Sequence, residues 1–352
     1  MYSTRYPYMS CEVICLEVPS IINTIINSNS KYLLKLFSLL DAAPPLDNYL
    51  AGYFEKVLEM LFRKETDVVM KLINSGETTL FRKFLDHIDN YSIMQIVQRL
   101  MLPHIPFSNA RDADADPALD DLPLEESCQW SLSEEYCDLL CLKMLDASHL
   151  EVSAHISDLL ITVVQLALPD SKVISNLSAE KCLHGVLTAA FPKISSPSSD
   201  CISLSAVSVL ESLVSRLGES FSPESEQASP EELDRIHELT SLCVANAVVK
   251  VSEFVGDISQ QLGELLHSQA SDTALYQSRT RAPRLGYRGL QLVKLVESLT
   301  RLDNDEIDLR MCESGILAKV VDLLLHFQHN SILHLSVQRI VSIFVQNSEH
   351  KR

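Results

Sequence analysis

Glycine is scarce in this chain, which has only 9 glycines among its 352 residues. A large protein of strands and tight turns normally uses more glycine, because many turns require its positive φ angles. The scarcity also argues against glycine-rich phosphate loops, and the sequence contains neither GxxxxGK[ST] nor GxGxxG. The GxSxG, HExxH and kinase signature motifs are missing as well. The sequence therefore predicts a protein that is not an enzyme and uses no cofactor.

Positive charge is also in short supply, since 29 Lys and Arg face 47 Asp and Glu, a net charge of −18. Phosphate backbones and anionic membranes are bound by concentrated basic surfaces, so neither nucleic acid nor membrane is expected as a partner. The longest strongly apolar run, Leu159–Leu168, reaches only about half a membrane span. The first apolar stretch, Cys11–Val18, contains two glutamates and is no signal peptide. We expect a soluble cytoplasmic protein, with the nucleus as a second location.

The nine cysteines are scattered and odd in number, unlike a secreted disulfide framework. We interpret them as reduced, buried thiols. Cys11 and Cys15 lack a second ligand pair nearby, and the i, i+4 pair Cys137 and Cys141 lies among leucines, which favours core packing over zinc. The histidines His326, His329 and His334 allow a metal site with a remote carboxylate, but a role at a helix junction is the more common use. No metal is predicted.

Helical periodicity recurs along nearly the whole chain. Leu50, Phe54, Val57, Leu58 and Leu61, for example, share one face of a helix. The pattern predicts helices over 20–27, 30–41, 47–64, 66–74, 77–88, 91–102, 131–145, 149–168, 179–190, 201–217, 230–270 (broken), 287–302, 306–314, 316–328 and 330–346. The fold class expected from this pattern is all-α.

Residues at the ends of these segments also favour helices. Asp47 and Ser92 each precede an amphipathic run, as a helix cap does. Ser229 is followed by Pro230 and two glutamates, the favoured order for a helix start. Gly315 lies between two periodic runs and is expected to form the turn between paired helices.

Many short helices joined by short turns are typical of an armadillo- or HEAT-like solenoid, and a globular helical bundle is the alternative. We expect a single solenoid domain over 1–352. Residues 103–128 carry four prolines and seven acids, which predicts an acidic flexible loop. Residues 218–232, rich in Ser, Pro and Glu, predict a second flexible insert.

Several N-terminal pieces resemble one known family, and they occur in the family's order. They are Tyr6–Val13 (YPYMSCEV), Leu33–Leu40 (LLKLFSLL), Pro45–Leu58 (PLDNYLAGYFEKVL), Arg63-Lys64 and Ser92–Met94. C-terminal pieces are similar too, namely Leu285-Gly286, Leu290–Leu295 (LQLVKL), Gly315–Leu317 and Asn330–Gln338 (NSILHLSVQ). Together they resemble the SAPS-domain family, the regulatory subunits of protein phosphatase 6, of which the chain would be a divergent or partial member. The sequence departs from that pattern at Gly289, where the family has Arg, and at His329, where it has Trp.

The resemblance implies a non-catalytic subunit that binds a phosphatase 6-type serine/threonine phosphatase catalytic subunit and directs it to substrates, with a further scaffold subunit as a second partner. Candidate partner-binding residues are Arg63, Lys64, Arg288, Asn330 and His334. For His334, a buried hydrogen bond at a repeat junction is favoured over direct partner contact. The alternatives are an armadillo-like adaptor with a partner that is not a phosphatase and, less favoured, a helical enzyme with an unrecognised site.

Overall fold

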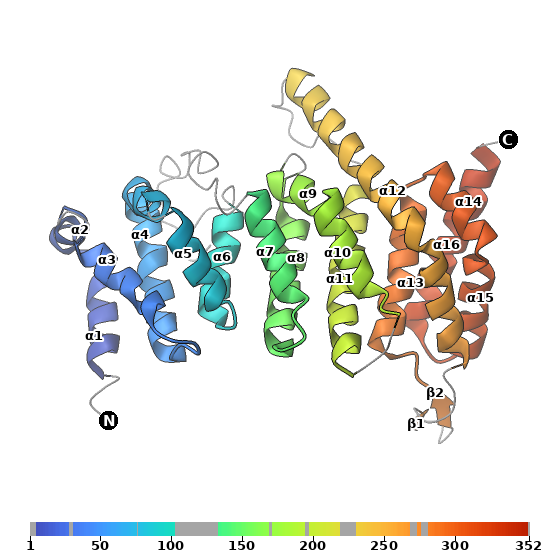
Figure 1. The fold of residues 1–352 in the computed structure, drawn as a ribbon, viewed down its shortest axis with the longest axis horizontal. Coiled ribbons are helices and arrows are strands. Elements are labelled where there is room, and N and C mark those ends of the chain that lie inside the picture. The colour runs from blue at the N-terminus through green and yellow to red at the C-terminus, as the bar shows by residue number, and fades with distance from the viewer. Residues whose placement is uncertain are drawn as a thin grey trace. The chain divides into compact units, whose positions relative to one another are not determined.

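The computed structural model describes residues 5–27, 31–75, 77–102, 133–168, 171–193, 197–218, 230–267, 273–275 and 281–350. Helices make up most of these residues, which confirms the all-α fold class (Figure 1). The chain divides into two compact units, Met1–Leu140 and Cys141–Arg352, with the boundary inside helix α7 (Glu134–Met144). The acidic stretch 103–128 and residues 219–229 of the second insert lie outside the described residues.

The first unit begins with α1 (Arg5–Ile14), α2 (Pro19–Ile26), α3 (Lys31–Phe37) and the 3-10 turn η1 (Ser38–Asp41). It continues with α4 (Asn48–Ser75), α5 (Glu77–Asp86) and α6 (Tyr91–Met101). The long helix α4 packs against both α1 and α6. The core of the first unit includes three phenylalanines in edge-to-face contact. The ring centroid of Phe37 lies 5.6 Å from that of Phe54 and 6.4 Å from that of Phe84.

The second unit contains α8 (Leu150–Leu166), α9 (Lys172–Leu177), α10 (Glu180–Ala190), α11 (Pro197–Gly218) and α12 (Pro230–His267). A short hairpin of β1 (Thr273–Leu275) and β2 (Arg281–Pro283) follows, antiparallel, with Thr273 opposite Pro283. The unit ends with α13 (Gly286–Arg301), α14 (Asp305–Glu313), α15 (Ile316–His326) and α16 (Ser331–His350).

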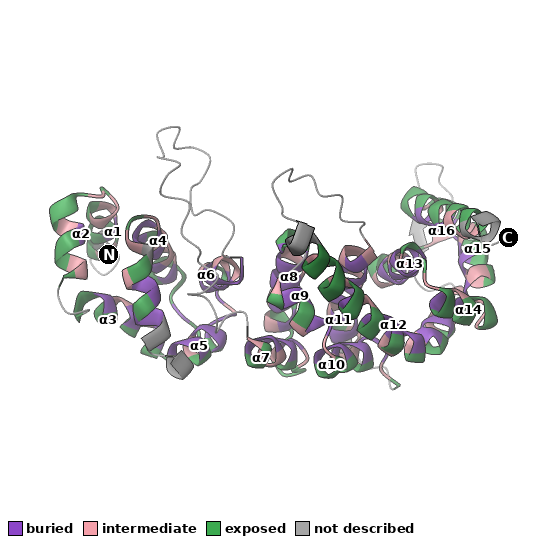
Figure 2. Ribbon diagram, turned by 90° about the horizontal axis from the view of Figure 1, so that it is seen from above, coloured by how far each residue is buried: buried purple, intermediate pink, exposed green. Residues whose placement is uncertain are grey.

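Two sets of neighbouring helices organise the second unit. In the first set, α11 packs against α8 and α13, and α13 also packs against α16. In the second set, α12 packs against α10, α14 and α15. Buried residues lie where these helices face one another and exposed residues cover their outer sides (Figure 2). The first part of α12 projects beyond its neighbours (Figure 1), and Leu239 and Leu242 are exposed there.

Several local predictions can be compared with the helix ends. Asp47 caps α4, since its Oδ1 accepts hydrogen bonds from the backbone N–H groups of Tyr49 and Leu50 at 2.9 and 3.1 Å. The predicted break between 64 and 66 matches the non-helical Glu65 (φ −146°, ψ 50°) inside α4. Gly315 has φ 70° between α14 and α15, which confirms the expected turn.

Other local predictions are wrong. Ser92 is not a cap: α6 begins one residue earlier and is capped by Asn90, whose Oδ1 accepts from the Ser92 N–H at 3.0 Å. The helix predicted as broken over 230–270 is the continuous α12. Helices α1 and α9 and the β1–β2 hairpin were not expected. The hairpin has three residues per strand, too few for an alternating pattern to be recognised.

Within the described residues, two helices meet the length and composition needed to cross a membrane, α11 over Ser199–Gly218 and α12 over Asp234–His267, and the pair Tyr6–Ile14 and Pro19–Ile26, bent by 103°, would be a third if it formed one span. In α11, 61% of the apolar window is buried, in line with its packing against α8, α10 and α13. The corresponding share in α12 is 33%. The expectation of no membrane partner therefore stays a prediction.

Candidate protein-binding surfaces

Arg63 and Lys64 both form ion pairs with one carboxylate of the same unit. Arg63 Nη2 lies 3.0 Å from Glu17 Oε1, and Lys64 Nζ lies 2.9 Å from Glu17 Oε2. Glu17 lies between α1 and α2 with φ 57°, so the two cations of α4 hold this turn in place. Lys56 adds a third pair with Glu12 of α1, at 2.7 Å. Both predicted partner-binding residues thus have a structural role, and their side chains stay 33% and 43% exposed.

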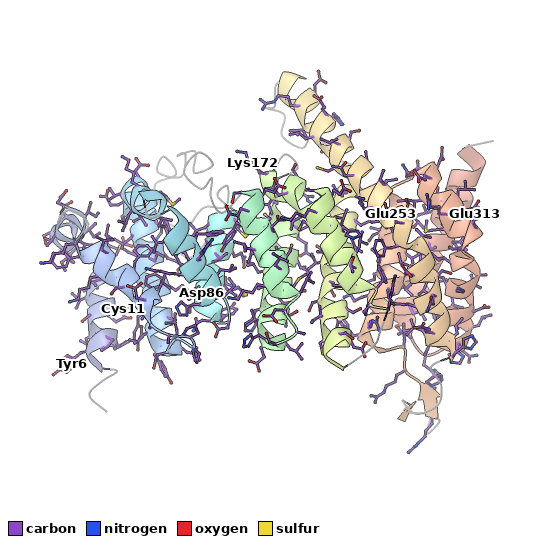
Figure 3. The ribbon with its side chains drawn as sticks, viewed as in Figure 1. Tyr6, Cys11, Asp86, Lys172, Glu253 and Glu313 are labelled. Atoms are coloured by element: carbon purple, nitrogen blue, oxygen red, sulfur yellow. The ribbon has the colours of Figure 1, made fainter. Side chains whose placement is uncertain are left out.

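Two thiols of the α1 region, Cys11 (labelled in Figure 3) and Cys15, contact backbone carbonyl oxygens of α4. Cys11 Sγ lies 3.8 Å from the Tyr53 carbonyl oxygen and Cys15 Sγ lies 3.9 Å from that of Lys56. Burial, followed by the neighbouring Cys11, raises the pKa of Cys15 to about 12. Burial raises the pKa of Cys11 as well. Both are therefore neutral thiols at pH 7, which is the opposite of what a nucleophilic cysteine needs.

Exposed tyrosines gather where α4 and α6 begin. Asn90 Nδ2 donates a 2.9 Å hydrogen bond to Asn48 Oδ1, so the first residues of the two helices lie side by side. The next residues, Tyr49 and Tyr91, are 68% and 65% exposed, and Leu50 is 38% exposed. We call Tyr49, Leu50 and Tyr91 the tyrosine patch. Tyrosines with this exposure are enriched where proteins bind one another, because the ring is large, rigid and partly polar.

A small pocket lies between α4 and α6, lined by Glu55, Leu58, Glu59, Phe62, Gln95, Ile96 and Arg99. Burial raises the pKa of the Glu55 carboxyl, and a hydrogen bond from Ser92 opposes that effect. A shifted carboxyl in a pocket is a feature of catalytic sites. The pocket is small, with room for about one water.

The candidate Arg288, on α13, bonds to two other helices of the second unit. Its Nη2 donates to Ser203 Oγ of α11 at 3.0 Å and to Gln261 Oε1 of α12 at 3.1 Å. Its Nε is buried and has no partner among the described residues. Arg288 thus joins the two sets of helices, and a partner could reach only its exposed third.

The candidates Asn330 and His334 both act at the turn between α15 and α16. Asn330 Oδ1 accepts from the Leu333 N–H at 3.0 Å, which caps α16. His334 Nε2 lies 3.2 Å from the Phe327 carbonyl oxygen. This is the junction hydrogen bond expected for His334, although the residue is only half-buried. Whether any of the five predicted residues contacts a partner stays a prediction.

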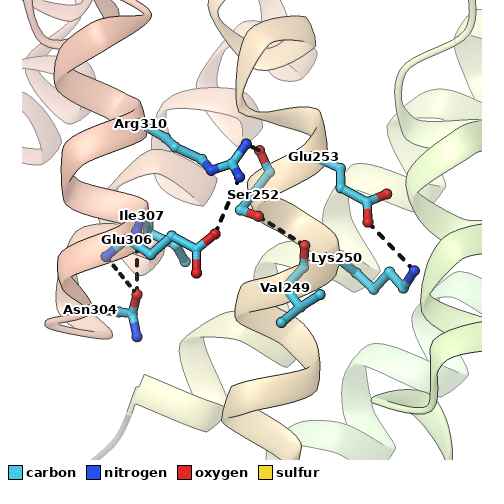
Figure 4. Close-up of polar contacts among 8 residues, drawn as sticks. All are labelled: Val249, Lys250, Ser252, Glu253, Asn304, Glu306, Ile307 and Arg310. Atoms are coloured by element: carbon cyan, nitrogen blue, oxygen red, sulfur yellow. Dashed lines mark hydrogen bonds and ion pairs between the residues drawn. The ribbon is translucent and has the colours of Figure 1, made fainter.

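Polar contacts also hold helices of the second unit, and Figure 4 shows those of α12 and α14. Arg310 of α14 donates to the Ser252 carbonyl oxygen of α12 and to Glu306, both at 3.3 Å. Lys250 of α12 lies 2.7 Å from Glu180 of α10 and 3.5 Å from Glu253. The hydrogen bond that Lys250 donates to the Glu180 carboxylate raises the pKa of Lys250. These contacts fasten α12 to α10 and α14.

A polar stripe on α13 was missed by the sequence analysis. It consists of Tyr287, Gln291, Lys294, Ser298 and Arg301, at alternating spacings of four and three residues. This spacing places all five on one face of the helix. The spacing of these polar residues is visible in the sequence, but only the apolar positions of the same helix were used to predict it.

No group of three or more His, Cys, Asp or Glu side chains is arranged to hold a metal ion within the described residues. The His326 ring packs on Phe327, with centroids 4.8 Å apart, and His334 is bonded as described above. The thiols of Cys141 and Cys182 lie 2.9 Å apart and buried, on α7 and α10. Cys137 is also buried, in agreement with a core role for the Cys137 and Cys141 pair.

Similarity to known proteins covers nearly the whole chain. It is 22% identical over 361 residues to mouse serine/threonine-protein phosphatase 6 regulatory subunit 2, over 98% of this chain and 35% of the relative. It is 20% identical over 353 residues to chicken serine/threonine-protein phosphatase 6 regulatory subunit 3, over 97% of this chain and 37% of the relative. It is 22% identical over 377 residues to human serine/threonine-protein phosphatase 6 regulatory subunit 1, over 96% of this chain and 38% of the relative. The chain is a distant relative of these phosphatase regulatory subunits.

The chain spans just over a third of the length of these curated relatives. A shorter match, 31% identical over 98 residues, relates it to the fission yeast extragenic suppressor of kinetochore protein 1, over 28% of this chain and 12% of that protein. No protein-family model matches the chain. No solved structure matches it either. These phosphatase 6 relatives are named as regulatory subunits.

Proposed function

We propose that this chain is a non-catalytic regulatory subunit that binds the catalytic subunit of a phosphatase 6-type serine/threonine phosphatase and directs it to substrates. The observation that carries the proposal is the similarity to phosphatase 6 regulatory subunits over 96–98% of the chain. A match that follows the whole chain concerns its overall architecture, whereas a short motif would concern one site.

The proposal includes a helical-repeat solenoid as the body of the subunit. The series α8, α11, α13 and α16, with α12 and its neighbours as a second set, supports it, because solenoids stack helices so that each contacts mainly its neighbours. Such proteins act through an extended surface and need no catalytic pocket. A cytoplasmic location, a nuclear pool and a further scaffold subunit are part of the same proposal.

The tyrosine patch is our proposed contact with the catalytic subunit. Tyr49 and Tyr91 leave about two thirds of their side chains in solvent, although each belongs to a helix whose other faces are packed. Truncation of such a ring at the centre of an interface costs about 2 kcal/mol or more of binding free energy. The patch belongs wholly to the first unit, so its geometry does not depend on how the two units are arranged.

The test is binding of the purified chain to a purified phosphatase 6-type catalytic subunit by biolayer interferometry. We expect a Kd of about 1 μM or lower, as for a specific complex. The double variant Tyr49→Ala with Tyr91→Ala should weaken binding at least tenfold. The matched control is Tyr6→Ala, which removes a ring that is 70% exposed on α1 and should leave the Kd within twofold. A folded chain that does not bind would support the adaptor alternative.

A further inference from the structure

The polar stripe of α13 is unusual because of where the helix lies. α13 packs against α11, α12 and α16, and most of its residues are buried. Gln291 and Ser298 of the stripe are 5% and 4% exposed, whereas Lys294 is half-buried and Tyr287 and Arg301 are exposed. Burying polar side chains costs free energy unless they form hydrogen bonds, so such a stripe is unfavourable for packing alone.

The hydrogen bonds of the stripe are incomplete. Gln291 Nε2 donates to Tyr287 Oη at 2.6 Å, but Gln291 Oε1 is buried with no partner in the described part of the chain. Ser298 Oγ donates to Glu211 Oε1 of α11 at 3.2 Å. A buried amide oxygen without a hydrogen-bond donor lowers the stability of the folded chain by about 1–3 kcal/mol.

The cations at the stripe determine the charge of that ligand. Lys294 and Arg301 belong to the stripe, and Arg339 of α16 flanks it. Both arginines contact the single carboxylate of Glu297, at 2.6 and 3.3 Å, so two guanidinium groups share one negative charge. Each guanidinium has five N–H donors, and their side chains are 42% and 58% exposed. The surface therefore has spare donors for anionic groups, in a chain whose net charge is −18.

We propose that the α13 stripe, together with Arg339, binds an extended acidic peptide segment of a partner protein. The Asp and Glu side chains of the peptide would bond to Lys294, Arg301 and Arg339, the cations of this surface that solvent reaches. Lys294 and Arg301 are seven residues apart, or about 10 Å at 1.5 Å per residue, which matches about three extended peptide residues. This inference does not depend on the identity of the phosphatase.

Charge complementarity favours a peptide over a nucleic acid. Glu211 and Glu297 lie among the cations, and a closely spaced row of phosphates would meet them as well as the overall negative charge. An acidic peptide with polar residues between its carboxylates can place its charges at the arginines and leave the glutamates opposite neutral groups.

The test is fluorescence polarisation with a labelled ten-residue peptide in which Glu and Ser alternate, at 50 and 300 mM NaCl. The intact chain should bind this probe with a Kd below about 100 μM at low salt, and more weakly at high salt because charged contacts are screened. A peptide in which Lys and Ser alternate, and a ten-nucleotide thymidine strand, should bind at least tenfold more weakly. Tighter binding of either would overturn the proposal.

The matched variants are Lys294→Glu and Lys172→Glu, which change the net charge equally. Lys172 is exposed on α9 of the same unit (Figure 3). Lys294→Glu should raise the Kd at least tenfold, and Lys172→Glu should leave it within twofold. Equal effects would mean that only net charge matters, and the proposal would fail. Hydrogen exchange of the unaltered chain provides a second readout, because the peptide should slow exchange in α13; unchanged exchange there at saturation would also overturn it.

Discussion

Asn90 connects two helices and caps one of them with the same side-chain amide. Its Nδ2 donates to Asn48 Oδ1 at 2.9 Å, while its Oδ1 accepts from the Ser92 N–H at 3.0 Å. The hydrogen bond between Asn48 and Asn90 brings the starts of α4 and α6 together, and Tyr49 and Tyr91 are the residues that follow these two. The residue that caps α6 thus also joins the two helices that carry the tyrosine patch.

Replacing Asn90 separates these two roles. Asn90→Ala removes both hydrogen bonds and should lower the free energy of unfolding by about 2 kcal/mol. Asn90→Asp keeps an acceptor for the Ser92 N–H but cannot donate to Asn48, so its free energy of unfolding should fall less than that of Asn90→Ala. Urea unfolding of both variants measures the difference. Equal stability of Asn90→Ala and the unaltered chain would contradict the assignment of the cap.

Glu297 is a buried carboxylate, with a side chain 8% exposed, between Arg301 and Arg339. Either arginine alone can compensate its charge, so Arg301→Ala or Arg339→Ala should each cost about 1 kcal/mol of stability. The double variant leaves the carboxylate buried and unpaired, which should cost about 3–5 kcal/mol. A double-mutant cycle by chemical denaturation tests this, and additive single effects would show that the two arginines act independently.

Two glycines provide a matched test of packing. A Cβ atom at Gly289 would lie 2.7 Å from Leu285 Cδ1 and 3.2 Å from Leu265 Cδ1, whereas one at Gly256 would meet nothing within 4 Å. Gly289→Ala should therefore destabilise the chain by about 1–3 kcal/mol through overpacking. Gly256→Ala, inside α12, should stabilise it by about 0.5–1 kcal/mol, since alanine favours helices. Thermal unfolding measures whether each variant is more or less stable than the unaltered chain. Stabilisation by Gly289→Ala would show that the site is not tightly packed.

The raised pKa of Cys15 predicts slow alkylation and a defined pH dependence. At pH 8, a short pulse of iodoacetamide should modify the exposed Cys201 and Cys312 well before Cys15, as measured by mass spectrometry of peptides. The folded state favours the protonated thiol, so the contribution of Cys15 to stability is complete below its ordinary pKa of 9.0 and is lost as pH rises toward about 12. Modification of Cys15 as fast as that of Cys312 would contradict the assignment.

The helices could be predicted from sequence because their apolar positions recur with helical spacing. The break at Glu65 and the turn at Gly315 were predicted for the same reason. Helix α9 was not, because it has only six residues, too short for a periodic pattern to be recognised.

The candidate surface was less predictable than the fold. The ion pair between Arg63 and Glu17 joins residues 46 positions apart, so sequence alone could not show that this cation already has a partner. The proximity of Tyr49 and Tyr91 along the fold depends on the hydrogen bond between the Asn48 and Asn90 side chains, which is likewise a tertiary contact. The α13 stripe is different. Its spacing is visible in the sequence, but only the structure shows that Gln291 and Ser298 are buried and that the helix packs against α11 and α16.

The central claim, a regulatory subunit of a phosphatase 6-type enzyme, is tested most directly by affinity isolation. A tagged chain is purified from cell extract at moderate salt, and its stoichiometric companions are identified by mass spectrometry. Our account predicts a phosphatase 6-type catalytic subunit in near-equal amount, reduced at least tenfold by Tyr49→Ala with Tyr91→Ala and not by Tyr6→Ala. Reproducible absence of that subunit from a folded chain would contradict the account.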